Sequence, residues 1–509
     1  MREIVLGTDG MTLEELVVIA RKGAKVRLAE QTRKMILEAR ELVEKWVGEG
    51  RVVYGVTTGF GALSDVAISR EETRQLQQNL LMSHAAGVGP VLDTETIRAV
   101  MALRAKDLAR GNSGIRLQTV ERLIELLNRG VYPVVPEKGS VGASGDLAPL
   151  AHLALVLIGL GEAFYQGERL KASEALKRCG LGPLELEAGE GVALINGTQV
   201  MTAIGGLATF DALHLSKIAD IAAAMSIEVL MGSRTEFNQR IHERRPHPGQ
   251  AAAADNMERL TRNSEIISSH KDCSRVQDAY TLRCSPQVHG ASKDAIGYVR
   301  RVIETEMNSS TSNPLIFPET QDFLLGGNFH GQPVALALDF LCMAVSEIAS
   351  ISERRVERLV NPFLSGLPAF LVNHGGLNSG FMIAQYTAAS LVSENKILSH
   401  PACVDSIPTS ANKEDHVSMG TICSRKAREV VKNSENVLAI ELLCAAQALD
   451  IFTNMKPGEG TLAAYRAIRD VVPHLDKDRM LSPDIERVVG LIKKGVLLSG
   501  VENKVGPLN

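Results

Sequence analysis

Aromatic residues make up only 4% of the 509 residues, and no long run of lysine and arginine occurs. The shortage of aromatic residues argues against a β-sandwich or barrel, because strands draw on aromatic and β-branched side chains. A formal net charge of −4 without a basic cluster argues against nucleic acid and anionic membranes as partners. Hydrophobic and charged fractions of 45% and 22% are ordinary, which excludes wholesale disorder.

Other absences bear on metal binding, on the redox state of the cysteines and on the location of the protein. The seven cysteines form no CxxC pair, and no His or Cys cluster has metal-ligand spacing, so we expect reduced thiols and no metal. The N-terminus has no apolar signal core. The most apolar stretch, 147–161, is shorter than the roughly 20 residues that span a bilayer. These features predict a cytoplasmic protein.

Long helical stretches dominate what the sequence does contain, and they predict a mainly α protein. Residues 1–200 mix short helical patterns with Gly-rich turns, whereas residues 201–509 form a bundle of long helices and a C-terminal helical region. We expect the two parts to form one continuous globular body. The predicted long helices cover residues 207–231, 331–360, 381–398 and 417–449.

The second of these helices has clear ends. Pro333 suits a first helical turn, and Asn361-Pro362 suits a stop. Residues 334–345 are apolar on nearly every side, so other helices or another subunit must cover them. The charged residues between 347 and 358 predict that the far end reaches water or a polar site.

The segment Gly142-Ala143-Ser144-Gly145-Asp146 has two interpretations. It is typical of a tight turn in which Asp146 caps a following helix. It also has the composition for a backbone reaction. The Gly145 nitrogen attacks the carbonyl of Ala143, and Ser144 loses its hydroxyl as water, which leaves an exocyclic methylene. The product is an electrophile that no unmodified side chain supplies.

This segment and six others, in the same order, resemble those of the aromatic amino acid ammonia-lyases. The resemblance extends from Tyr54 to beyond Ser418 and so covers most of the chain. The matching segments are 54–55, 83–89, 139–150, 193–199, 277–290, 326–331 and 393–419.

The resemblance implies a fumarase/aspartase-like helical architecture and a homotetramer whose active sites are shared between subunits. It also implies a 4-methylidene-imidazol-5-one group (MIO) that forms autocatalytically from Ala143, Ser144 and Gly145, with Asp146 assisting ring closure. No external cofactor is expected.

The same resemblance assigns catalytic roles to residues that have simpler interpretations. Arg283, otherwise a structural ion-pair partner, would bind the substrate carboxylate with its planar guanidinium. Tyr54, otherwise a half-buried aromatic residue, would take the β-proton, with Tyr280 assisting. Asn196, otherwise an Asx turn, would hydrogen-bond to MIO or substrate, and Gln277 would line the same pocket.

Three further residues bear on the choice of substrate. By resemblance His84 faces the substrate side chain, although a lone His is usually only a packed residue. Phe329 would wall the pocket. Glu414, if it is not a surface residue near a helix N-terminus, suits an imidazole ring, because a carboxylate accepts a ring N–H and stabilises positive charge. In the phenylalanine and tyrosine branches the position of Glu414 is typically Gln.

The resemblance and these residues together imply a carbon-nitrogen lyase that converts L-histidine to trans-urocanate and ammonia, the first step of histidine degradation. A tyrosine or phenylalanine ammonia-lyase or 2,3-aminomutase of the same family remains the alternative. More remote are a fumarase-like lyase, whose flexible Gly-Ser loop is not recognisable here, and an inactive helical scaffold.

Overall fold

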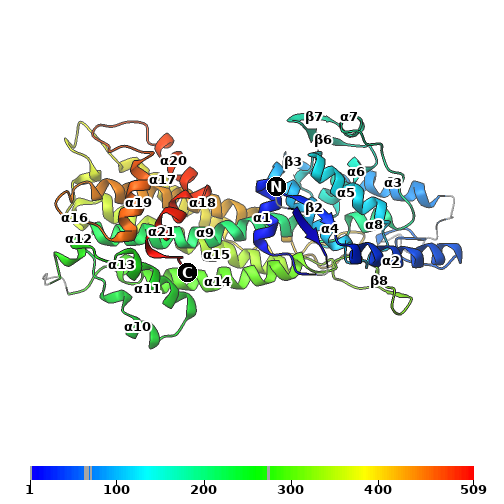
Figure 1. Cartoon of the computed structure of the whole chain (residues 1–509), viewed down its shortest axis with the longest axis horizontal. Helices are drawn as coiled ribbons and strands as arrows, with labels where there is room; N and C mark the ends of the chain where they lie inside the picture. The colour runs from blue at the N-terminus through cyan, green and yellow to red at the C-terminus, as the bar shows by residue number, and fades with distance from the viewer. Residues whose placement is uncertain (1–2, 8, 62–67, 69–71, 272–275) are drawn as a thin grey trace. The chain divides into compact units, whose positions relative to one another are not determined.

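The computed structural model describes residues 3–7, 9–61, 68, 72–271 and 276–509 (Figure 1). Helices dominate, which confirms the mainly α prediction. Two compact units are present. Unit 1 comprises Met1–Phe210, Arg300–Asp339 and Pro401–Arg425, and unit 2 comprises Asp211–Val299, Phe340–His400 and Lys426–Asn509.

Unit 1 contains all of the strands in the described part of the chain, in four small sheets ordered β1-β2, β3-β5, β4-β6-β7 and β8-β9. The β1-β2 pair is parallel and the others are antiparallel. The strands are β1 (Glu3–Leu6), β2 (Lys25–Leu28), β3 (Val88–Val91), β4 (Tyr132–Pro133), β5 (Pro136–Lys138), β6 (Glu162–Tyr165), β7 (Glu168–Lys171), β8 (Leu315–Phe317) and β9 (Asp322–Leu324).

The first of the helices that lie wholly in unit 1 begins and ends at residues with a clear local cause. Thr12 and Glu15 form a capping box on the first helix, and Gly23 ends that helix with φ +68°. The helices are α1 (Leu13–Lys22), α2 (Glu30–Gly48), α3 (Thr73–His84), α4 (Thr94–Leu108), α5 (Leu117–Arg129), α6 (Leu147–Leu157), α7 (Ala172–Arg178) and α8 (Glu190–Ile195).

All regular elements in the described residues of unit 2 are helices. Its two short 3-10 helices are η2 (Thr235–Phe237) and η3 (Ala369–Leu371). Its α-helices are α10 (Gln239–Glu243), α11 (Pro248–Leu260), α12 (Glu265–Ser268), α13 (Tyr280–Arg283), α16 (Pro362–Ser365), α17 (Met382–Leu398), α19 (Glu459–Arg469), α20 (Ser482–Lys493) and α21 (Val496–Val505).

Four long helices have residues in both units: α9 (Gln199–Val229), α14 (Ser285–Met307), α15 (Gln332–Val360) and α18 (Gly420–Leu449) (Figure 1). Helices α9, α15, α17 and α18 confirm the long helices predicted from the sequence, whereas α14 was not predicted. The division at residue 200 stays a prediction, since the two compact units divide the chain differently and each gathers segments far apart in sequence.

Helix α15 begins one residue before Pro333 and ends at Val360, before Asn361-Pro362, as expected. By length and composition it is also the one described helix that could cross a membrane, but 67% of its apolar window is buried, as in a core helix. The prediction that its charged end reaches water or a polar site is confirmed at the exposed Arg354, whereas Arg355 reaches no water. That side chain is fully buried against Glu441 of α18, with Nε 2.5 Å from Oε1.

Candidate active site

The Ala143-Ser144-Gly145 loop lies between β5 and α6 and has little room for side chains. Gly142 has φ +67° and Gly145 has φ +72°, a region that favours glycine. A Cβ on Gly145 would lie 2.2 Å from the carbonyl oxygen of Gly197, and a Cβ on Gly142 would lie 2.2 Å from Ser418 Oγ. The flanking glycines are therefore required by both conformation and packing.

Residues just before α18 hold the loop from a distant part of the chain. Ser418 Oγ donates to the carbonyl of Gly142 over 2.8 Å, and the Met419 amide donates to the carbonyl of Val141 over 2.8 Å. Ala143 is buried against Met419. The loop is thus fixed on the N-terminal side of the residues predicted to cyclise.

Asp146 is fully buried but does not cap the helix that follows it, so the capping interpretation is wrong. Its Oδ2 instead accepts the amides of Val200 and Met201, in the first turn of α9, over 3.0 and 2.8 Å. Its Oδ1 accepts the hydroxyls of Ser140 and Thr421. Burial raises the pKa of Asp146, although these hydrogen bonds oppose the shift.

Glu414 stands on a tight hairpin. The Thr409 amide donates to the Glu414 carbonyl over 2.9 Å, and residues 410–412 between them all have positive φ, from 51° to 66°. Three successive non-glycine residues in this region are strained, and such strain is typical of functional sites. The hairpin presents the carboxylate to the loop, where Ser144 Oγ donates to Glu414 Oε1 over 2.6 Å.

Tyr54 and His84 both respond to the charge of Glu414. Burial raises the pKa of Tyr54, and Glu414 raises it further, while a hydrogen bond from the Gly61 amide to the hydroxyl opposes the shift. Burial lowers the pKa of His84, with Glu414 opposing, so a neutral imidazole is favoured. The structure therefore gathers Tyr54, His84, Ser144 and Glu414 into one cluster within unit 1.

Asn196 follows the last residue of α8, and Gly197 beside it forms a bridge with Gly145. The Asn196 side chain is buried, and its Oδ1 has no hydrogen-bond partner among the residues that the structure describes. An unpaired buried amide oxygen beside the loop leaves hydrogen-bonding capacity for another group.

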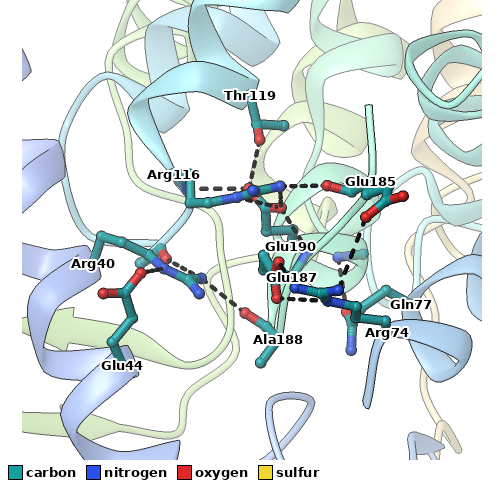
Figure 2. A network of polar contacts seen from close by, with 12 residues as sticks. Arg40, Glu44, Arg74, Gln77, Arg116, Thr119, Glu185, Glu187, Ala188 and Glu190 are labelled. Atoms are coloured by element: carbon teal, nitrogen blue, oxygen red, sulfur yellow. Dashed lines mark hydrogen bonds and ion pairs between the residues drawn. The ribbon is translucent and has the colours of Figure 1, made fainter. Parts of the chain in front are cut away.

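The other end of α8 is anchored by the fully buried Glu190 (Figure 2). Its carboxylate accepts from the side chain of Arg116, the hydroxyl of Thr119 and the amide of Glu187. Gln77 of α3 accepts the Gly191 amide over 2.9 Å, which ties the helix that carries His84 to the helix that precedes Asn196.

The segment 326–331 also reaches the loop. The Gly331 amide donates to the Gly142 carbonyl over 3.4 Å, and Phe329, two residues earlier, is half-buried. The ring of His330 stacks on that of His416, with centroids 5.7 Å apart. The segment that carries Phe329 therefore contacts the loop and the hairpin, and the role of Phe329 as a pocket wall stays a prediction.

Gln277, Tyr280 and Arg283 belong to unit 2, so the structure does not gather them with the loop. Gln277 and Arg283 line a cavity of about 640 Å³. The Arg283 guanidinium lies 4.6 Å from the centroid of the Tyr280 ring, which is 70% exposed. Arg283 Nε has no hydrogen-bond partner in the described part of the chain, so the guanidinium retains unused donor capacity.

Comparison with known proteins decides the family. The family model for aromatic amino acid lyases matches residues 11–470. The chain belongs to the aromatic amino acid lyase family. Within it, the chain is 58% identical to the histidine ammonia-lyase of Symbiobacterium thermophilum over 508 residues, all of both chains.

Solved structures of the family have the same fold. The histidine ammonia-lyase of Trypanosoma cruzi is 42% identical with a TM-score of 0.93, covering 99% of this chain and 96% of that one. A tyrosine aminomutase from Streptomyces globisporus is 38% identical with a TM-score of 0.95, covering all of both chains. These matches confirm the predicted carbon-nitrogen lyase and its helical architecture.

The family generally depends on MIO, and the residues of this chain fit that group. The loop has glycine where a Cβ would clash, the hydroxyl to be lost is on a half-buried serine, and an unpaired amide oxygen lies on the adjoining turn. Sequence reasoning missed Ser418 and Thr421, which support the loop from the start of α18, because nothing in their local pattern indicates a partner so distant in sequence.

Proposed function

We propose that the protein is a histidine ammonia-lyase, which converts L-histidine to trans-urocanate and ammonia. The observation that carries this proposal is the position of Glu414, whose carboxylate is one hydrogen bond from Ser144. A carboxylate there accepts the N–H of an imidazole, whereas beside a phenyl ring it would be desolvated without a partner. Similarity to named histidine ammonia-lyases over the whole chain supports the same substrate.

The prosthetic group proposed is MIO, formed from Ala143, Ser144 and Gly145 without an external cofactor. It supplies an electrophilic carbon that activates the amino group of the substrate for departure. The residues of the chain provide the rest. Asp146, whose carboxylate binds the N-terminus of α9, would support ring closure, and Asn196 offers an unpaired oxygen on the turn that adjoins the loop.

The substrate is oriented by groups at its two ends. His84, kept neutral by burial, and Glu414 hold the imidazole, and Phe329 packs beside them. Arg283 binds the α-carboxylate, with Tyr280 and Gln277 at its side. Tyr54 takes the β-proton once it is ionised.

A homotetramer with shared sites would bring Arg283 of one subunit to the loop of another. The face of α15 supports such an assembly, because Leu336, Phe340 and Met343 are 51%, 40% and 43% exposed at helical spacing. The protein is also proposed to be cytoplasmic and to bind a free amino acid as its substrate.

The alternative is a tyrosine or phenylalanine lyase or aminomutase, which the close structural match to a tyrosine aminomutase keeps in view. Incubating the protein separately with L-histidine, L-tyrosine and L-phenylalanine tests it, because urocanate, coumarate and cinnamate have different ultraviolet spectra. We expect the absorbance of urocanate to increase with L-histidine, and no product absorbance with L-tyrosine or L-phenylalanine. Growth with tyrosine or phenylalanine instead, or a β-amino acid detected by chromatography, would overturn the assignment. No product with any of them, and a mass without loss of water, would indicate an inactive scaffold.

A further inference from the structure

The two turns next to the reacting loop are held together through their backbones. Gly145 and Gly197 form a bridge, and the Asp146 amide donates to the Gly197 carbonyl over 2.8 Å. A Cβ on Gly145 would lie 2.2 to 2.8 Å from backbone atoms of Gly197, so the two segments are too close for a side chain at Gly145. The position of the 196–198 turn therefore sets the position of the residue whose nitrogen closes the ring.

Arg104, near the C-terminal end of α4, lies directly behind the 196–198 turn. Its Nη1 donates to the carbonyl of Asn196 over 3.0 Å and to Oε1 of Gln199 over 2.6 Å. A Cβ on Gly197 would lie 2.5 Å from the same Nη1. The guanidinium thus binds the residues on both sides of Gly197 and packs against Gly197 itself.

The guanidinium is also fully enclosed. Arg104 is 0% exposed, and its charge is balanced by Asp107, whose Oδ2 lies 2.8 Å from Nη2. Asp107 in turn accepts the amide of Thr311 over 3.2 Å and the side-chain amide of Gln199. Asp107 thus holds the side chains of Arg104 and Gln199, both of which contact the turn.

Stability alone is a weak explanation for this arrangement. A buried ion pair is often no more stabilising than an apolar pair of similar volume, because desolvation offsets the Coulombic attraction. Arg104 Nε, moreover, has no hydrogen-bond partner among the described residues, which adds to the cost of burial. What an apolar pair cannot do is fix the direction of the Asn196 carbonyl and hold Gly197 at one distance.

We propose that Arg104 is a positioning residue, which holds Gly197 against Gly145 for ring closure and points the Asn196 side chain at the substrate. The first part concerns formation of the ring, and the second rests on the proposed function. Arg104 touches neither the ring nor the substrate and acts through the 196–198 turn.

The test compares Arg104→Lys and Arg104→Met with Arg98→Lys and Arg98→Met. Arg98 is a matched control, because it is a second buried arginine of α4 that donates to backbone carbonyls, those of Ile19 and Ala24, away from the turn. Intact mass gives the fraction of chains lighter by two water molecules, and steady-state kinetics gives kcat and KM. Thermal unfolding reports whether each variant is folded.

We expect both Arg104 variants to contain a larger share of unmodified chains than the Arg98 variants. In the matured fraction we expect kcat to fall about 100-fold, since misplacement by about 1 Å has that effect. KM should change by less than about threefold, because the ground-state contacts remain. Arg98 variants of equal thermal stability should keep the wild-type mass and kcat.

A folded Arg104→Lys or Arg104→Met protein with complete loss of both waters and wild-type kcat would overturn the proposal. If Arg104→Met does not fold, Arg104→Lys decides, because lysine keeps a positive charge beside Asp107. If the wild-type protein loses both waters but makes no urocanate, the proposed function fails, while the mass comparison still judges the role of Arg104.

Discussion

Ser144 donates its hydroxyl to Oε1 of Glu414 over 2.6 Å, although 270 residues separate the two in sequence. The same carboxylate accepts the hydroxyl of Thr409 at Oε2, so both of its oxygens are engaged. The Glu414 carboxylate is thereby placed to hold Ser144 before the backbone cyclises and to contact the substrate ring afterwards.

Replacing Ser144 by Ala should abolish turnover, because alanine has no hydroxyl to lose and the electrophile cannot form. We expect a loss on the order of 1,000-fold or more, since removing even one stabilising donor from an active site costs about 100- to 1,000-fold. Intact mass should show the variant without the loss of two waters. Ser499→Ala, at an exposed position of α21, is the control. Full activity in Ser144→Ala would refute the electrophile.

Replacing Glu414 by Gln should weaken the preference for histidine. The amide keeps the shape but loses the negative charge, and a hydrogen bond to a charged group contributes about 1.5–3 kcal/mol. We expect kcat/KM for L-histidine to fall about 10- to 100-fold, and by less for L-tyrosine and L-phenylalanine. Intact mass must first show that the variant matures. An equal loss for all three amino acids would mean that Glu414 does not select the ring.

The same variant should shift the pH dependence through Tyr54. A phenol acts as a base only when ionised, so activity should rise as the pH approaches the pKa of Tyr54. Burial raises that pKa, and the charge of Glu414 raises it further. Removing the charge should lower the pKa, so the rising limb of kcat/KM should move to lower pH in Glu414→Gln. Tyr54→Phe should show no such limb. A limb unchanged in Glu414→Gln would assign it to another group.

Much of the fold follows from local patterns in the sequence. Pro333 and Asn361-Pro362 give the ends of α15, and apolar runs give the long helices. The small residues around Ser144 indicate the loop, because only a few side chains tolerate its conformation. These signals are predictable since their causes lie within a few residues of one another.

Contacts between distant segments could not be predicted in the same way. Asp146 has the position of a cap on α6, yet its carboxylate binds the first turn of α9, because the packing of the two helices decides the partner. Arg104 is visible as a charge in an apolar stretch, but nothing nearby indicates that it holds the 196–198 turn. Likewise, nothing near Arg355 in the sequence predicts its burial, because its partner Glu441 lies on another helix, α18.

The buried pair of Arg355 and Glu441 allows a prediction about stability that is independent of the active site. Nε lies 2.5 Å from Oε1, and Nη2 donates to Oε2 over 3.0 Å, with both side chains fully buried. Arg355→Met alone should destabilise the fold by about 3–5 kcal/mol, because it leaves an uncompensated buried carboxylate. Adding Glu441→Leu should restore most of that loss, since neither charge then needs solvation.

Chemical denaturation of the single and the double variant measures both effects. Arg169→Met is the control, because the Arg169–Glu162 pair is exposed and its removal should leave the unfolding midpoint in place. A double variant no more stable than Arg355→Met would mean that the pair acts through its hydrogen bonds to Ser285 and Ser352 and not through charge balance.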